Sequence, residues 1–197
     1  MTARVIPLRR PEAGVAALSD EALLAACALA DSAALGALFD RHHLRVHRFL
    51  ARLAGVGPVE VEDLLQETFA SVWSSARRYQ GRSPALTWIF GIAANIARNH
   101  ARSRQRGARA MFALSELPST PPERSDDIAA RKESLRRIEA ALSAIPHDLR
   151  VAFVLCDLEG ISGVDAAKTL DVRPGTIWRR LHEARTLLRR ALEEVVP

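Results

Sequence analysis

The spacing of apolar residues restricts this chain to one kind of structure. They recur with the 3.6-residue period of an α-helix, and no segment alternates for long with the two-residue period of a strand. This pattern predicts helices over residues 19–30, 32–54, 59–76 and 84–106. It resumes near 128 and continues to the C-terminus, with breaks at Pro146, at 160–163 and at 172–175. We therefore expect an all-α fold.

Between the two helical stretches the composition changes. Residues 107–127 contain Gly107, three prolines and four acidic residues, which is typical of an exposed linker. The chain of 197 residues is long enough for two small domains, and 48% of it is hydrophobic, enough for packed cores. We predict a flexible N-terminal tail at 1–18, a helical domain at 19–106, a flexible linker at 107–130 and a second helical domain at 131–197.

The charge and the cysteines narrow the class of protein. The net charge is +5, and all but two of the 28 basic residues are arginine, which favours an anionic partner. Cys27 and Cys156 are the only cysteines, they are far apart and they have no ligand-like spacing, so neither a disulfide scaffold nor a zinc ribbon fits. The basic N-terminus has no apolar core after it, and no run approaches the roughly 18 apolar residues of a membrane span. We expect a cytoplasmic protein with no membrane insertion, no metal and no cofactor.

The clearest motif is a helix-turn-helix at the C-terminus. A short helix with small residues on its inner face is predicted over 162–171, and a turn over 172–175. A second helix is predicted to start at Thr176 and to run through Arg190. The second helix has one apolar face and one basic face, which suits the major groove of DNA. The candidate DNA contacts are Arg173, Thr176, Trp178, Arg179, Arg180, His182 and Arg185. An ordinary helical hairpin with a solvated basic face is the alternative.

A second motif lies at residues 63–73. Asp63, Gln66 and Glu67 share one helix face, opposite Phe69 and Trp73. Three acceptor groups placed together can receive the basic side chains of a partner helix. Taken alone, a solvated acidic face would explain the same residues.

A third motif precedes the linker. From Arg82 to Arg109 there are six arginines and no acidic residue, and Asn95, Asn99 and Arg102 share the face away from the apolar stripe. Asparagine can pair with base edges, and arginine neutralises phosphates. The loop at 79–83 adds an aromatic ring and polar groups that could hold an unstacked base. Trp88 is suited either to stacking on DNA or to the core.

These motifs together resemble sigma factors of bacterial RNA polymerase. Residues 142–162 and the helix-turn-helix, with Asp165-Ala166-Ala167 and Gly175-Thr176-Ile177, are similar to the fourth sigma domain. Residues 63–73 resemble the polymerase-docking signature of the second domain, and 86–102 its promoter helix. With two domains and a short linker, the chain is identified as a member of the extracytoplasmic-function sigma factors.

The resemblance implies partners and roles for these residues. The partners are core RNA polymerase, through the clamp helices of its largest subunit and its flap, then promoter DNA and an anti-sigma factor. The implied polymerase contacts are Asp63, Leu64, Gln66, Glu67 and Phe69. The implied −10 contacts are Tyr79, Arg82, Ser83, Trp88, Asn95, Arg98, Asn99 and Arg102. The helix-turn-helix would read the −35 element.

Four positions depart from the family pattern. Asn99 replaces a common Asp, Gly163 stands where helix formers are usual, and Trp178 and Glu183 replace basic residues. The −35 preference therefore cannot be taken over from relatives.

Two other classes of function explain the sequence less well. A simple helix-turn-helix regulator would leave the second and third motifs unexplained, and an enzyme with a metal on His43 and His47 would have no evident third ligand.

Overall fold

The computed structural model describes residues 13–112, 138 and 140–193, and these residues form helices with no strand among them. The N-terminal part, residues 13–112, contains α1 (Ala13–Ala16), α2 (Asp20–Ala28), α3 (Ser32–Ala54), α4 (Pro58–Ser75), the 3₁₀ turn η1 (Ala76–Arg78) and α5 (Ala85–Phe112). The C-terminal part, residues 140–193, contains α7 (His147–Phe153), the π-type turn η2 (Val154–Leu158), α8 (Gly163–Thr169) and α9 (Pro174–Glu193). The predicted all-α class and helix-turn-helix are confirmed.

Local signals account for the ends of the helices. Asp31 caps α3 by accepting a hydrogen bond from the Ala33 amide at 2.9 Å, and Gly55, with φ 58°, ends it in the left-handed region that glycine adopts without strain. Pro58 opens α4 at the first helical position, where its missing N–H would have no partner in the helix. The observed bounds of α3 coincide with the predicted 32–54.

Three elements differ from the prediction. The helix α9 begins at Pro174, two residues before Thr176, because proline fits the first helical position, and the turn is correspondingly earlier. The helix α5 continues to Phe112, past the expected linker boundary at 106, and α1 lies within the expected tail. The rest of the expected linker, 113–130, lies outside the described residues.

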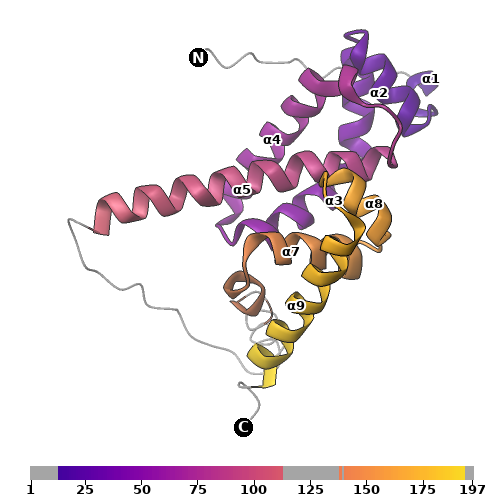
Figure 1. Cartoon of the computed structure of the whole chain (residues 1–197). Coiled ribbons are helices and arrows are strands. Elements are labelled where there is room, and N and C mark those ends of the chain that lie inside the picture. The colour runs from indigo at the N-terminus through magenta and orange to yellow at the C-terminus, as the bar shows by residue number, and fades with distance from the viewer. Residues whose placement is uncertain (1–12, 113–137, 139, 194–197) are drawn as a thin grey trace, which may run out of the picture.

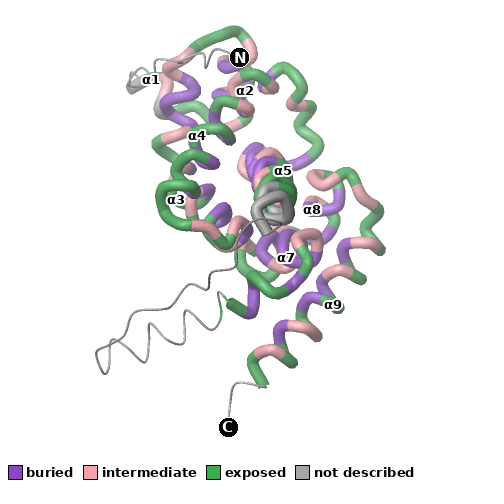
Figure 2. The backbone as a smooth tube through the Cα atoms, turned by 90° about the vertical axis from the view of Figure 1, so that its left-hand side faces the viewer, coloured by how far each residue is buried: buried purple, intermediate pink, exposed green. Residues whose placement is uncertain are grey.

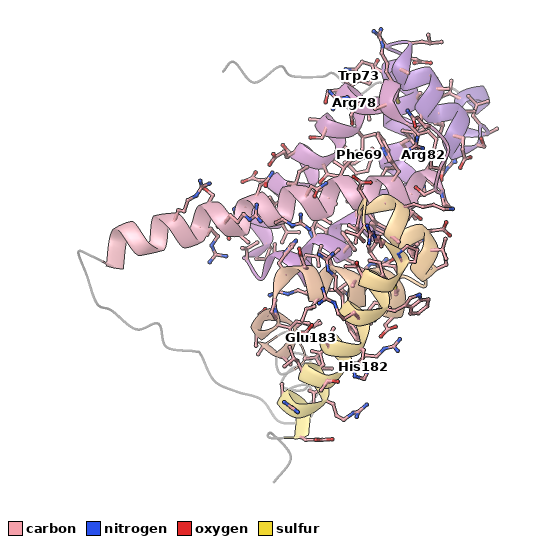
Figure 3. All side chains as sticks on the ribbon, viewed as in Figure 1. Phe69, Trp73, Arg78, Arg82, His182 and Glu183 are labelled. Carbon is pink, nitrogen blue, oxygen red and sulfur yellow. The ribbon has the colours of Figure 1, made fainter. Side chains whose placement is uncertain are left out.

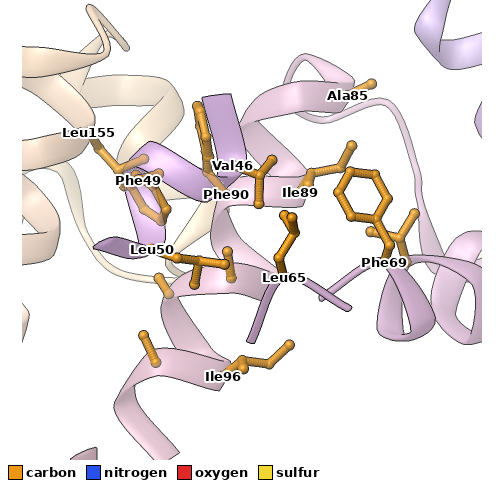
Figure 4. Packing of buried hydrophobic residues seen from close by; sticks show 14 of the residues in the cluster. Val46, Phe49, Leu50, Leu65, Phe69, Ala85, Ile89, Phe90, Ile96 and Leu155 are labelled. Carbon is orange, nitrogen blue, oxygen red and sulfur yellow. The ribbon is translucent and has the colours of Figure 1, made fainter. Parts of the chain in front are cut away.

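One hydrophobic core runs through both parts of the molecule. The rings of Phe49 from α3 and Phe90 from α5 lie 4.5 Å apart, and Leu155 from η2 belongs to the same buried cluster (Figure 4). The helix α5 lies between α3 and α4 on one side and α8 and α9 on the other (Figures 1 and 2). A smaller cluster lies under the C-terminal half of α9 and includes Leu142, Leu149 and Leu188.

The two parts meet in a polar and tightly packed contact, which we call the joint. Its centre is Arg150, only 8% exposed, whose guanidinium donates to the carbonyl oxygens of Leu53 in α3 (2.7 Å), Ser143 (2.7 Å) and Ile145 (3.1 Å). Burial lowers the pKa of Arg150. Because a buried charge is costly without such partners, these three bonds tie Arg150 to both parts.

Two further contacts belong to the joint. The Glu159 carboxylate receives Arg45 (3.1 Å) and Arg52 (2.9 Å) from α3. Gly91 of α5 lies so close to α8 that a Cβ at this position would be 2.5 Å from Thr169 Cγ2 and 3.2 Å from the Thr169 carbonyl oxygen. The absence of a side chain at residue 91 therefore permits α5 and α8 to approach closely here.

Candidate functional site

The acidic face of α4 is open to solvent. Asp63, Gln66 and Glu67 are all exposed, as their spacing predicted. Leu64 and Phe69 are 2% and 4% exposed and belong to the core. Phe69 is seen within the packed cluster in Figure 4. These two residues hold α4 against its neighbours and, in this arrangement, cannot touch a partner directly.

The loop before α5 forms a compact aromatic corner. The Tyr79 hydroxyl donates to the Ser83 carbonyl oxygen (2.8 Å), and the Tyr79 ring lies 5.4 Å from that of Trp88. Burial, followed by the nearby carboxylates of Glu21 and Asp20, raises the pKa of Tyr79, so the phenol stays protonated and keeps donating. Arg82 is exposed beside this corner (Figure 3). Both rings are partly buried. One part of Trp88 packs against the core, and another part is accessible at the surface.

The loop is also tied to the C-terminal part. Ser83 is 8% exposed, and its hydroxyl accepts a hydrogen bond from the Thr169 hydroxyl at 3.2 Å. The predicted nucleic-acid role of Ser83 thus requires this contact to break.

The polar face of α5 is only partly available. Asn95, Asn99 and Arg102 are exposed and lie on one face, as predicted. Arg98 is half-buried and pairs with Asp148 of α7 at 2.8 Å. Three of these four candidate −10 contacts are therefore free to meet a ligand, and the fourth is held by the other part of the chain.

The candidate recognition helix α9 and the turn before it show a similar division. Arg173, Trp178, Arg179 and His182 are exposed, and His182 projects from α9 beside Glu183 (Figure 3). Thr176 is half-buried. The remaining two arginines have acidic partners: Arg185 binds both oxygens of Asp157 (2.8 and 2.6 Å), and Arg180 binds Asp148 at 2.8 Å.

One carboxylate thus links the two candidate DNA-reading helices. Oδ1 of Asp148 pairs with Arg98 of α5, and Oδ2 pairs with Arg180 of α9, each at 2.8 Å. A guanidinium bound to a carboxylate cannot at the same time neutralise a phosphate with the same N–H groups. In this arrangement Arg98 and Arg180 bind one carboxylate of α7 instead of DNA phosphates.

The histidine cluster considered as a metal site does not gather ligands. Nδ1 of His43 lies 3.0 Å from the Phe39 carbonyl oxygen, and the His43 ring stacks on Phe39 with centroids 5.0 Å apart. Within residues 13–112, 138 and 140–193, no three His, Cys, Asp or Glu side chains are grouped so as to hold a metal ion. In the same described residues, no helix combines the length and apolar character that crossing a membrane requires.

Comparison with known proteins gives a consistent result. Residues 38–107 match the family model of sigma-70 region 2, and residues 135–188 match that of sigma-70 region 4. The chain is 38% identical to the RNA polymerase sigma factor CarQ of Myxococcus xanthus over 159 residues, which is 80% of this chain and 88% of CarQ. It is 33% identical to the ECF RNA polymerase sigma factor SigM of Mycobacterium tuberculosis over 88% of this chain and 85% of SigM.

The chain belongs to the extracytoplasmic-function sigma factors.

As a sigma factor, the protein binds core RNA polymerase and promoter DNA and directs the initiation of transcription. Its region 2 match contains the acidic face of α4 and the polar face of α5, and its region 4 match contains most of the helix-turn-helix. A similar solved structure is that of CnrH in complex with the cytosolic domain of CnrY, with a TM-score of 0.67 and 25% identity. The match covers 90% of this chain and 99% of that one.

Sequence reasoning missed the residues that close this sigma factor on itself. Asp148 and Glu159 carried no signal, because each meets partners from a distant segment. Arg150 did carry a signal, because it directly precedes the apolar run 151–155. An arginine that is buried together with such a run must find hydrogen-bond acceptors. What the sequence could not reveal is that one acceptor is the Leu53 carbonyl oxygen at the end of α3.

Proposed function

We propose that the three surfaces of this sigma factor divide its work. The acidic face of α4 docks on the clamp helices of the polymerase, α5 with loop 79–83 binds the −10 strand, and the N-terminal half of α9 reads the −35 duplex. The domain limits that go with these roles are 19–106 and 131–197. The factor acts in the cytoplasm and has no catalytic role of its own. The observation that carries this proposal is the exposure of Asp63, Gln66 and Glu67 on one face, away from the joint.

The shared carboxylate of Asp148 supports a second element of the proposal, a change of conformation. The −10 and −35 elements are centred about 25 base pairs apart, so their centres are separated by roughly 85 Å at 3.4 Å per base pair. Here Arg98 and Arg180 both lie 2.8 Å from one carboxylate. A molecule closed in this way cannot reach both elements, so we infer that the two parts separate when the factor binds the core enzyme.

An apolar groove on the C-terminal part supports the expected contact with the flap. It has a volume of about 770 Å³ and is lined mainly by Ile138, Leu142, Phe153, Leu188 and Leu192. The groove lies at the C-terminal end of α9, and Arg185 is the one candidate DNA contact among its lining residues. The other candidate contacts lie at or toward the N-terminal end of α9. DNA and an apolar segment of the flap can therefore bind α9 at the same time.

We further propose that an anti-sigma factor controls this protein. The similar structure of CnrH contains the cytosolic domain of CnrY, and its likeness to the present fold extends over nearly the whole of both chains. A partner that stabilises the closed form would keep Arg98 and Arg180 on Asp148 and away from DNA. Such a partner inhibits by favouring one of two conformations.

The docking role is tested by binding of the full-length protein to core RNA polymerase. The double variant Asp63→Ala/Glu67→Ala should weaken binding about 10- to 100-fold, because charged contacts at an interface centre are worth about 1–3 kcal/mol. Glu62→Ala is the matched control, since residue 62 is exposed on the same helix but about 100° away from Asp63. Equal affinity of the double variant and the wild type would contradict the proposed docking face.

The promoter role is tested by transcription in vitro. Purified protein with core polymerase should initiate at specific promoters in a genome-wide run-off assay, and the protein without core should bind those promoters weakly, because avidity comes from the assembled complex. A simple helix-turn-helix regulator would bind its DNA equally well without polymerase. Specific binding without core, and no initiation with it, would refute the proposal.

A further inference from the structure

Two of the departures from the family pattern meet in space. Gly163, the first residue of α8, lies under the indole ring of Trp178, which extends from α9. A Cβ at Gly163 would lie 2.8 Å from Trp178 Cζ2, 3.1 Å from Cη2 and 3.2 Å from Cε2. Any side chain at residue 163 would therefore displace this ring.

The backbone gives no other reason for a glycine at this position. Gly163 lies within α8, its φ is not in the left-handed region, and the start of the helix is already capped by Ser162, which accepts from the Asp165 amide at 3.1 Å. Alanine in a helix is favoured over glycine by about 1 kcal/mol. The three nearest atoms to the missing Cβ all belong to Trp178, so the function of this glycine is to make room for the indole.

The indole is held in place and yet remains accessible. Trp178 is 56% exposed although one edge of its ring packs on Gly163. A side chain already fixed in its binding position loses little conformational entropy on binding. Trp178 also lies one turn into α9, where recognition helices present side chains to base edges.

The chemistry of indole selects the kind of base edge that it can read. Its only polar group is one N–H donor, and it cannot neutralise a phosphate as the exposed neighbour Arg179 can. In the major groove the one apolar feature of a base pair is the 5-methyl group of thymine. We propose that Trp178 is a specificity-determining residue that packs against a thymine methyl in the −35 element, and that Gly163 is the positioning residue that presets its ring. This inference rests on the proposed role of α9.

The proposal is tested with holoenzyme, assembled from core polymerase and the full-length chain, and promoter duplexes randomised over the −35 element. Wild-type holoenzyme should select thymine at one position. Replacing that thymine by deoxyuridine, which lacks only the methyl group, should weaken binding about fourfold, the equivalent of burying one methyl group. Trp178→Ala should bind the two duplexes equally.

Gly163→Ala should also lose most of the discrimination between thymine and deoxyuridine. Its melting temperature should stay equal or rise, because the indole can move outward and alanine favours the helix. Val164→Ala, at the next residue of α8, where the side chain is exposed, is the control and should discriminate as the wild type does.

The outcomes separate this inference from the function it rests on. If wild-type holoenzyme selects a −35 sequence but binds thymine and deoxyuridine equally, or if Trp178→Ala still discriminates, the thymine inference is overturned and the role of α9 stands. If wild-type holoenzyme selects no −35 sequence at all, the proposed role of α9 fails, and the inference fails with it.

Discussion

Substituting alanine for Gly91 should open the molecule without unfolding it. In α5 the new methyl group favours the helix by about 1 kcal/mol whether the two parts are together or apart. In the closed form it would lie 2.5 Å from Thr169 Cγ2, and 3.2 Å from the Thr169 carbonyl oxygen. Overpacking of this kind costs about 1–3 kcal/mol, and the cost falls on the closed form alone. The equilibrium should therefore shift toward the open form by about 5- to 150-fold.

The shift can be measured by energy transfer between dyes on the two parts. Cysteines introduced at Glu62 in α4 and Arg190 in α9, both exposed, carry the dyes after Cys27 and Cys156 have been replaced. Transfer efficiency should fall in Gly91→Ala, and its apparent affinity for core polymerase should rise, because less of the protein has to open first.

Two further variants make this prediction specific to the contact. Adding Thr169→Ser to Gly91→Ala removes Cγ2 but keeps the hydroxyl that donates to Ser83, so it should restore much of the closed form. Gly175→Ala places a Cβ in α9 where no atom lies within 4 Å, and it should leave the transfer efficiency unchanged. Equal transfer in Gly91→Ala and the wild type would refute the reasoning that the α5–α8 contact holds the protein closed.

Other variants test the rest of the joint. Arg150→Met removes a buried donor from three backbone carbonyls and should lower the free energy of unfolding, measured in urea, by about 2–4 kcal/mol. The exposed control Arg104→Met should change this free energy by less than about 0.5 kcal/mol. Equal effects of the two variants would contradict the role assigned to Arg150. His147 also lies at the joint, because its Nε2 atom is 3.2 Å from the Ala94 carbonyl oxygen of α5. Burial, followed by two neighbouring arginines, lowers the pKa of His147 from 6.5 to about 4. Because the unfolded chain then binds more protons than the folded one, the stabilisation from His147 is fully present above pH 6.5 and should be lost as the pH falls from 6.5 toward 4. His147→Gln should flatten the dependence of stability on pH between pH 6.5 and 5. An unchanged slope in this variant would contradict the assignment to His147. Glu159→Gln removes the charge that pairs with Arg45 and Arg52, so it should shift the dye-labelled protein toward the open form by about 1 kcal/mol at low salt. The shift should be smaller at 1 M salt, because salt screens ion pairs. A shift that does not depend on salt would exclude ion pairing as its cause.

The helices and the character of their faces could be predicted from the sequence, because the signals that set them are local. Asp31 and Gly55 stand at the two ends of α3, and its observed bounds coincide with the predicted 32–54. The exposure of Asp63, Gln66 and Glu67 followed from helical spacing alone. The start of α9 was wrong by two residues for a similarly local reason, the position of Pro174.

The arrangement of the two parts was decided by contacts between residues far apart in the chain. Arg52 and Glu159 are 107 positions apart, and Arg150 and Leu53 are 97 apart. Spacing rules reach only a few residues, so they could not tell that Arg98 and Arg180 share one carboxylate while Arg179 remains exposed. Leu64 and Phe69 were named among the polymerase contacts because of the resemblance to the family, and the packing of α4 against its neighbours buries both.

The sequence by itself thus determined an all-helical sigma factor with an acidic helix face, a polar helix and a helix-turn-helix. Only the tertiary structure decided which of those side chains are available and which are held inside the molecule. It also showed that Gly163 and Trp178, two unrelated departures in the sequence, form one contact. The physical reason is that a helix face follows from the rise and turn of one segment, whereas the partner that covers it depends on how distant segments pack together.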